Sequence, residues 1–167
     1  KYYIINTRHL YLGDYMYKVL LLILLITTPV GGSIDSNGIQ RMIAGKQIDC
    51  IAKTVYFEAR GESEEGKIAI ANVVLNRFKS GNYNDFCSVV YQKRQFSWTL
   101  MRRRKIKEEV SWKESRLIAN DIYYDNLEDN TYGATHFHKS TIKPRWIKSF
   151  RKVAVIGNHV FYIKKNK

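Results

Sequence analysis

The stretch TVYFEARGESEEGKIAIANVVLNR, residues Thr54–Arg77, holds two apolar segments with helical spacing and an acidic, glycine-containing break between them. Gly61 in this break is typical of a helix end, and Ser63 is typical of the residue that caps the next helix. The two glutamates after Ser63 fall in the first turn of that helix, where the helix dipole favours carboxylates. The sequence therefore places Glu58 and Glu62 at a joint between two helices.

The regions around this stretch predict further helices. We expect the first helix to begin near Asp49, after a polar linker over residues 34–47, and the second to run from Ser63 to Gly81. The second helix carries an apolar face with helical spacing. The members of that face are Ile68, Ala71, Leu75 and Phe78.

The later part of the chain predicts one more helix and a β element. Residues 82–88 are expected to form a loop, a short helix is expected to start at Val89, and residues 112–124 show helical spacing. Residues 132–138 and 153–163 are rich in β-branched and aromatic side chains, which favour extended structure. The predicted fold class is α+β, mostly helical, with a small β element late in the chain.

The composition favours an anionic partner. The chain has 167 residues and a formal net charge of +13, with 12 Tyr, 7 Phe and 3 Trp. A strongly basic protein is drawn to a polyanion, and the candidates are nucleic acid, an anionic membrane and an anionic cell wall. Aromatic side chains serve the core, but they also form platforms for sugar rings or bases. The length indicates one domain, which we assign to residues 48–167.

Residues 16–33 have the layout of a secretory signal peptide: Lys18, then the apolar run Val19–Ile26, then small residues. The apolar run is shorter than the ~20 residues that a membrane span requires. We therefore expect an exported protein, in the periplasm or the cell wall, without stable membrane insertion after removal of the leader. A buried core helix and a retained anchor are the alternatives. Residues 1–15 are excluded from the fold as a disordered segment or an upstream artefact.

Cys50 and Cys87 are the two cysteines of the chain. An even pair in an exported protein favours a disulfide, which would close a loop of about 37 residues. Two buried thiols are the alternative. A catalytic cysteine is less favoured, because neither residue stands beside a histidine in a recognisable pattern.

Glu58 is a candidate general acid. Cleavage of a glycosidic bond needs a carboxylic acid whose pKa is raised enough to keep its proton at the working pH. Tyr56 and Phe57 precede Glu58, and apolar surroundings raise the pKa of a carboxyl group by disfavouring its charged form. The alternative is that Glu58 pairs with Arg60 or with the start of the next helix. Glu62 is expected to support the backbone of the loop.

The segment YQKRQFSW, Tyr91–Trp98, is a candidate wall of a sugar-binding cleft. Gln95 and Ser97 can donate and accept hydrogen bonds, and Phe96 and Trp98 offer apolar faces. A core aromatic pair with solvated neighbours is the alternative.

The segment THFH, Thr135–His138, together with His159 raises the possibility of a zinc site, because neutral imidazole is a common zinc ligand. On a strand, His136 and His138 point to the same side, but no HExxH or CxxC motif accompanies them. We therefore expect no metal and no cofactor, and we assign both histidines to the polar edge of a cleft.

The basic segment MRRRKIKEEV, Met101–Val110, is a candidate contact for nucleic acid. Behind a leader peptide, however, a solvated basic face or a contact with an anionic wall is favoured. The sequence contains no helix-turn-helix or RNP pattern, no P-loop, no GxSxG and no dinucleotide-binding glycine motif. We therefore expect no nucleic-acid partner.

Five segments, in order from about Asp49 to Ile163, carry a resemblance to a known family: YFEARGESEEGKIAIANVVLNR, FCSVVYQKRQFSW, GATHFH, PRW and IGNHVFY. Together they resemble the cell wall hydrolase family of the SleB and CwlJ type. The resemblance implies a lysozyme-like fold of the lytic transglycosylase branch. It implies cleavage of the bond between N-acetylmuramic acid and N-acetylglucosamine in peptidoglycan. It assigns the catalytic acid to the first glutamate of EARGE, Glu58, and we expect a monomer.

The chain departs from the spore enzymes of this family at THFHKS, so no family role transfers to His136 or His138. No second carboxylate stands in a comparably marked motif, since Glu62, Asp85 and Asp121 are weak candidates, and this favours transglycosylase chemistry. Three other functions stay open: a muramidase that hydrolyses with water, a zinc amidase or peptidase, and a non-catalytic basic module that binds wall or nucleic acid.

Overall fold

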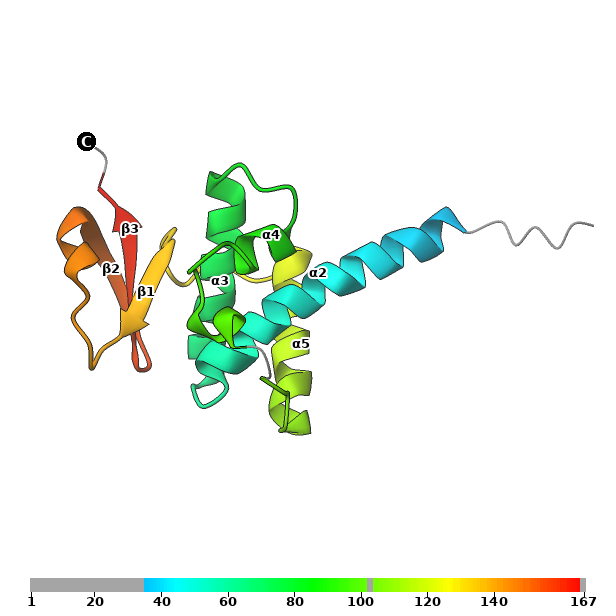
Figure 1. Cartoon of the computed structure of the whole chain (residues 1–167), viewed down its shortest axis with the longest axis horizontal. Coiled ribbons are helices and arrows are strands. Elements are labelled where there is room, and N and C mark those ends of the chain that lie inside the picture. The colour runs from blue at the N-terminus through cyan, green and yellow to red at the C-terminus, as the bar shows by residue number, and fades with distance from the viewer. Residues whose placement is uncertain (1–34, 102–103, 166–167) are drawn as a thin grey trace, which may run out of the picture. The chain divides into compact units, whose positions relative to one another are not determined.

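The described part of the chain has helices in its N-terminal portion and a small antiparallel sheet in its C-terminal portion (Figure 1). The structure is a computed structural model that describes residues 35–101 and 104–165. The chain up to Ser36 belongs to a separate unit, and the description below concerns the unit that begins at Asn37. The expected leader, residues 16–33, and the excluded residues 1–15 lie outside the described residues. The predicted mostly helical α+β class is confirmed.

The first described helix, α2, covers Ser36–Ala59 and is longer than predicted. The prediction of a linker over residues 34–47 and of a helix start near Asp49 is therefore wrong. Only the part from Ile48 onward is packed into the core, whereas Met42 is 70% exposed. The segment before Asp49 contains two glycines but also good helix formers such as Arg41, Met42 and Ala44, and the helix extends through it beyond its packed part. Among the described helices, none is both long and apolar enough to cross a membrane.

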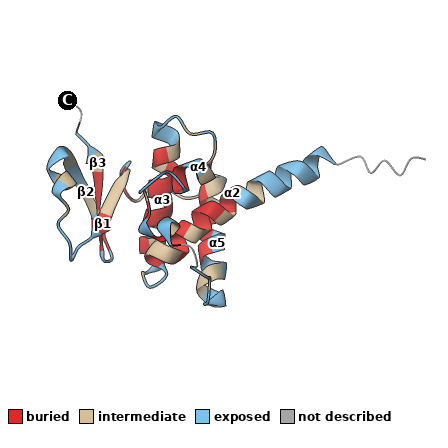
Figure 2. Ribbon diagram, viewed as in Figure 1, coloured by how far each residue is buried: buried red, intermediate tan, exposed pale blue. Residues whose placement is uncertain are grey.

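Helix α3, Glu64–Ser80, confirms the predicted second helix. The Ser63 hydroxyl accepts a hydrogen bond from the backbone N–H of Gly66 at 3.3 Å, and the helix ends at Gly81. Figure 2 shows that buried residues follow this helix along its length. The burial is two-sided, because Ala71 and Leu75 pack in the helical core while Ile70 and Val73 pack in a second cluster with the sheet. The expected apolar face is thus only one of two.

Three shorter helices follow. Helix α4 covers Phe86–Val90, so the loop predicted over residues 82–88 ends earlier than expected. The helix begins after Asp85, whose carboxylate accepts a hydrogen bond from the Ser88 N–H at 2.6 Å. A single 3₁₀ turn, η2, covers Ser97–Leu100. Helix α5, Glu109–Tyr123, confirms the predicted third helix with a slightly earlier start.

The disulfide predicted from the sequence is present in the structure. It joins Cys50 in α2 to Cys87 in α4, with their Cα atoms 5.2 Å apart. The bond therefore fixes α4 to the buried half of the first helix.

The sheet has three antiparallel strands in the order β1-β3-β2. Strand β1 covers His136–Lys139, β2 covers Phe150–Ile156 and β3 covers His159–Lys164, and the 3₁₀ turn η3, Arg145–Ser149, precedes β2. This confirms the predicted late β element. Phe161 and the partly buried Phe137 pack with α3, so one face of the sheet closes the second core cluster.

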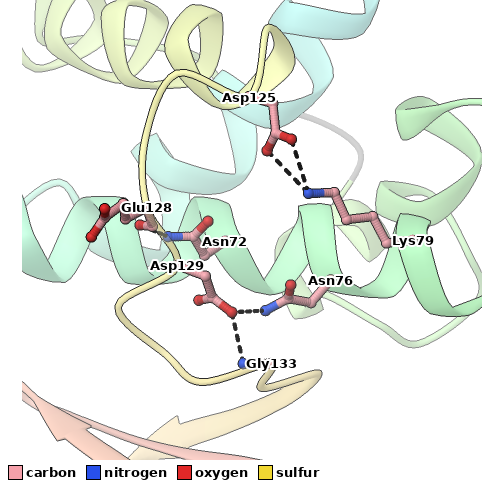
Figure 3. A network of polar contacts seen from close by, with 7 residues as sticks. All are labelled: Asn72, Asn76, Lys79, Asp125, Glu128, Asp129 and Gly133. Atoms are coloured by element: carbon pink, nitrogen blue, oxygen red, sulfur yellow. Dashed lines mark hydrogen bonds and ion pairs between the residues drawn. The ribbon is translucent and has the colours of Figure 1, made fainter.

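The segment between α5 and β1 is held to α3 by side-chain amides (Figure 3). The Asn72 amide donates to the carbonyl oxygen of Glu128 at 3.2 Å, and the Asn76 amide donates to the Asp129 carboxylate at 2.9 Å. The backbone N–H of Gly133 also donates to Asp129, at 2.7 Å. Burial alone would raise the pKa of Asp129, but these hydrogen bonds and those from Thr131 lower it overall. The network fixes the point at which the chain enters the sheet.

Candidate active site

A cleft of about 510 Å³ lies where the end of α2, the segment around η2 and the sheet come together. It contains most of the residues that the sequence analysis selected. Those lining it are Glu58, Gln95, Phe96, Ser97 and His138. Further lining residues come from α3, from strands β1 and β3 and from the segment before β2, among them Arg77, Phe137, Lys139, Trp146 and His159.

Glu58 occupies the last turn of α2 and is half-buried in this cleft. Burial raises the pKa of its carboxyl group, and the positive charges of Lys139, Arg104 and Arg77 only partly oppose this rise. Within the described residues, the side chain of Glu58 forms no hydrogen bond or ion pair. The alternative of a pair with Arg60 is contradicted, because the Arg60 Nε lies 3.3 Å from the Glu108 carboxylate instead.

Glu58 is the only carboxylate among the described residues that line the cleft. The other ionisable residues there are Arg77, Arg94, Lys139 and two histidines. The cleft thus places one carboxyl group among basic side chains, and aromatic side chains also line it. The described lining residues do not include a second carboxylate of the kind that glycoside hydrolases use as nucleophile or base.

Glu62, the second carboxylate of the joint, lies outside the cleft lining. Its two oxygens accept hydrogen bonds from the backbone and side-chain nitrogens of Asn158, at 3.0 and 3.1 Å. Burial would raise the pKa of Glu62, but the Asn158 hydrogen bonds and the nearby His159 and Lys139 lower it overall. Glu62 is therefore positioned to hold the turn between β2 and β3, in agreement with the supporting role expected for it.

Arg77 lines the cleft, although no role was predicted for it from the sequence. Its side chain is buried, its Nε donates to the carbonyl oxygen of Thr135 at 2.6 Å, and its guanidinium carbon lies 5.1 Å from the centre of the Phe96 ring. Burial lowers its pKa to about 10, so it remains charged at neutral pH. Its Nη1 is buried and has no hydrogen-bond partner within the described structure. The only feature of the sequence that pointed to Arg77 was its position at the end of the stretch Thr54–Arg77.

The YQKRQFSW segment is divided between two sites. Gln95, Phe96 and Ser97 line the cleft, whereas Trp98 turns away from it and packs on Phe57, with ring centres 4.9 Å apart. Trp98 lines a separate hollow on the other side of η2.

The three histidines have different surroundings. His138 Nδ1 donates to the carbonyl oxygen of Lys139 at 2.7 Å, and its Nε2 lies 3.0 Å from the Tyr162 hydroxyl, so both ring nitrogens are engaged. His136 lines an adjoining hollow of about 400 Å³ that shares Arg77 and Gln95 with the cleft, and burial lowers its pKa to about 4.

His159 is fully buried, and burial also lowers its pKa despite the nearby Glu62 carboxylate, 3.7 Å from Nδ1. Within residues 35–101 and 104–165, no three ligand-type side chains come together in a way that could hold a metal ion. The absence of a cofactor stays a prediction.

Comparison with known proteins identifies the family. The profile described as cell wall hydrolase matches residues 61–162. The chain belongs to the cell wall hydrolase family. The matched segment starts at residue 61 and therefore does not include Glu58.

Named relatives of the chain are spore cortex-lytic enzymes. The one from Oceanobacillus iheyensis is 28% identical over 134 residues, which cover 78% of this chain and 46% of the relative. The one from Bacillus subtilis is 30% identical over 119 residues, which cover 71% of this chain and 38% of the relative. The chain thus spans less than half the length of these relatives.

Two solved structures resemble the fold of this chain. The catalytic domain of SleB from Bacillus cereus has a TM-score of 0.57 and 28% identity, and covers 70% of this chain and 89% of that domain. The catalytic domain of the germination-specific lytic transglycosylase SleB from Bacillus anthracis has a TM-score of 0.56 and 26% identity, with coverages of 70% and 93%. The expected lysozyme-like class, with a small β element, is confirmed.

Proposed function

We propose that this protein cleaves the glycosidic bond between N-acetylmuramic acid and N-acetylglucosamine in peptidoglycan, as a lytic transglycosylase with Glu58 as its general acid and base. The observation that carries the proposal is the cleft with a single carboxylate. Glu58 is half-buried with a raised pKa, unpaired within the described residues, and surrounded by cationic and aromatic side chains. Family membership and the names of the relatives support a wall substrate.

The chemistry follows from one carboxyl group used twice. Glu58 donates its proton to the glycosidic oxygen, and the bond between this oxygen and the anomeric carbon of muramic acid breaks. The resulting Glu58 carboxylate then takes the proton of the 6-hydroxyl of the same sugar, whose oxygen bonds to the anomeric carbon. The products are a new free sugar end and a 1,6-anhydromuramic end, and no water is consumed. Glu58 returns to its protonated form.

Hydrolysis would need a different arrangement of the site. Inverting glycosidases hold a second carboxylate about 6.5–9.5 Å from the acid, and retaining ones hold it at about 5–5.5 Å. The described cleft lining contains only Glu58. This supports the intramolecular attack by the 6-hydroxyl over activation of water.

The remaining cleft residues suit a saccharide with acidic substituents. Arg77 and Lys139 provide positive charge beside Glu58, and Gln95 and Ser97 provide hydrogen-bonding groups. The half-buried Trp146 offers an aromatic face of the kind that packs on sugar rings. We assign these residues, with His138, to substrate binding, and Glu62, Trp98, His136 and the buried core residue Phe96 to support of the site.

The setting of the reaction is part of the proposal. A wall substrate requires export, which the leader-like residues 16–33 and the Cys50–Cys87 disulfide support. The high positive charge suits an anionic wall, with no nucleic-acid partner and a monomeric enzyme.

The experiment that tests the proposal is mass spectrometry of the fragments released from purified peptidoglycan. We expect 1,6-anhydromuramic ends, and a loss of about 10²–10⁴-fold in rate for Glu58→Gln. Reducing muramic ends would instead identify a muramidase, and released stem peptides would identify an amidase or peptidase. Binding without any fragments would identify a non-catalytic module. Glu58→Gln cleaving at the parent rate while folded would refute the assignment of the acid.

A further inference from the structure

A second hollow, of about 240 Å³, lies on the other side of η2 from the catalytic cleft. The turn separates the two, because its Ser97 and Leu100 line the cleft while Trp98 and Thr99 line the hollow. The side chains that give the hollow its character are Lys53, Phe57, Tyr91, Trp98 and Arg104. A ligand bound in the hollow would therefore lie next to a substrate bound in the cleft.

The hollow contains two cations and no carboxylate among its described lining residues. The side chain of Lys53 forms no hydrogen bond or ion pair within the described residues. Arg104 makes only a 3.2 Å contact from its Nε to the sulfur of Met101, and its guanidinium carbon lies 5.8 Å from the centre of the Phe57 ring. Some basic residues of the same unit do have acidic partners, for example Lys67 with Glu114 at 2.6 Å. The cations of the hollow are thus available to an external anion.

Aromatic side chains form the floor between these cations. The rings of Phe57 and Trp98 pack at 4.9 Å, and Tyr91 meets Trp98 edge-on at 6.0 Å and is 49% exposed. The hollow therefore offers apolar surface together with positive charge, which suits an organic carboxylate better than a small inorganic anion.

The backbone a few residues after Arg104 is held by a buried side chain. The hydroxyl of the buried Tyr56 accepts hydrogen bonds from the backbone N–H groups of Lys107 and Glu108, at 3.0 and 3.1 Å. Ile106, between them and Arg104, lines the hollow. Arg104 also lies close enough to Glu58 to lower the pKa of that carboxyl group, which places the hollow within electrostatic reach of the reaction centre.

We propose that this hollow, which we call the stem pocket, binds a carboxylate of the peptide stem carried by a muramic acid residue seated in the adjacent cleft. The inference rests on the proposed function, because it takes the cleft to hold a glycan strand. Peptide stems combine carboxylates with short aliphatic side chains, and this matches the paired cations and the aromatic floor. The stem pocket would make the enzyme select peptide-bearing glycan over bare glycan.

The test compares two soluble substrates made from one peptidoglycan preparation: glycan strands with tetrapeptide stems, and the same strands stripped by an amidase. On the acidic plateau of the pH profile, the parent enzyme should have the higher kcat/KM on stem-bearing strands. Lys53→Gln and Arg104→Gln should each lower kcat/KM on these strands by about threefold to fivefold, as expected for a part-exposed ion pair. Both variants should leave kcat/KM on bare strands unchanged. Amidation of the stem carboxylates should lower the kcat/KM of the parent enzyme on stem-bearing strands to that of the two variants.

Lys105→Gln is the matched control, because it removes one charge from an exposed residue beside the stem pocket that does not line it. It should keep the preference for stem-bearing strands. Equal parent rates on both substrates, or equal losses on both in the Lys53 and Arg104 variants, would overturn the inference. If neither substrate is cleaved, the proposed function fails. Titration calorimetry with the two kinds of strand then still decides whether the folded protein binds stems through Lys53 and Arg104.

Discussion

Glu62, in the loop between α2 and α3, accepts hydrogen bonds from both the backbone and the side-chain nitrogen of Asn158, in the turn between β2 and β3. These contacts join two segments that are 96 residues apart in the sequence. The preceding residue, Gly157, has a φ of +54°, and a Cβ there would collide with the Glu62 carboxylate. A larger residue at this position would force the Glu62 carboxylate to move and would strain the left-handed backbone. The loop that follows Glu58 is therefore held by the sheet.

The Glu62→Gln variant should be less stable than the parent. The amide can still accept one hydrogen bond from Asn158, but it loses the charge that strengthens both, so we expect a loss of about 1–3 kcal/mol in the free energy of unfolding. Thermal unfolding followed by circular dichroism measures this loss. Glu64→Gln, at an exposed site in the first turn of α3, should change stability much less. Activity should fall less than in Glu58→Gln, because Glu62 holds the turn and does not line the cleft.

The same variant should alter the dependence of stability on acid. The pKa of Glu62 is lower in the folded than in the unfolded protein, so its contribution is complete above the unfolded pKa and is lost as pH falls through the folded pKa. Glu62→Gln lacks this titration. The stability difference between the parent and Glu62→Gln should therefore shrink as the solution is made acidic. A constant difference across the acidic range would contradict this account.

Reduction of the Cys50–Cys87 disulfide should destabilise the domain. The two cysteines are separated by 37 residues, and loss of such a cross-link is expected to cost about 3–4 kcal/mol in the free energy of unfolding. For a domain of this size the melting temperature should fall by roughly 10 °C. The double variant Cys50→Ala, Cys87→Ala should melt at the temperature of the reduced parent. A parent that melts identically with and without reductant would show that the bond does not form in solution.

Activity should survive treatment with EDTA. His138 has both ring nitrogens engaged, and the described residues contain no group of three metal-ligand side chains. The parent rate on peptidoglycan should therefore be the same before and after dialysis against the chelator. Loss of activity with recovery on added zinc would move the assignment to an amidase or peptidase.

The sequence predicted the elements whose signals are local. The Ser63 cap, the acidic first turn and Gly81 predicted α3. The β-branched and aromatic residues over 153–163 predicted extended structure, although not the hairpin that they form. The start of α2 was not predictable in this way, because the N-terminal part of that helix packs on little and its pattern resembles a linker.

The composition of the cleft depends on tertiary structure and could be predicted only in part. Glu58 stood out because it occupies a break between helices. Arg77, Lys139 and Trp146 meet it only through the packing of α3, β1 and η3. Arg77 and Trp146 stand in segments that carry the family resemblance, but their local sequence gave neither of them a role in the cleft. Trp98 was assigned to the same wall as Ser97, but the 3₁₀ turn directs these two neighbours to opposite sides.

The charge around Glu58 gives the sharpest test of its role. Burial raises the pKa of the Glu58 carboxyl group, and Lys139 is the charge that opposes this rise most, followed by Arg104. A general acid works only in its protonated form, so kcat/KM should fall as pH rises through the pKa of Glu58. Lys139→Gln removes the opposing charge, and the alkaline limb of the profile should move to higher pH. Arg104→Gln should move the limb in the same direction.

The matched control is Lys113→Gln, because Lys113 pairs with Glu109 on the exposed side of α5 at 2.9 Å and does not line the cleft. Its profile should coincide with that of the parent, although its net charge equals that of Lys139→Gln. A limb that moves to lower pH in Lys139→Gln, or equally in all three lysine and arginine variants, would mean that the titrating group is not Glu58. An alkaline limb that persists unchanged in the residual activity of Glu58→Gln would lead to the same conclusion.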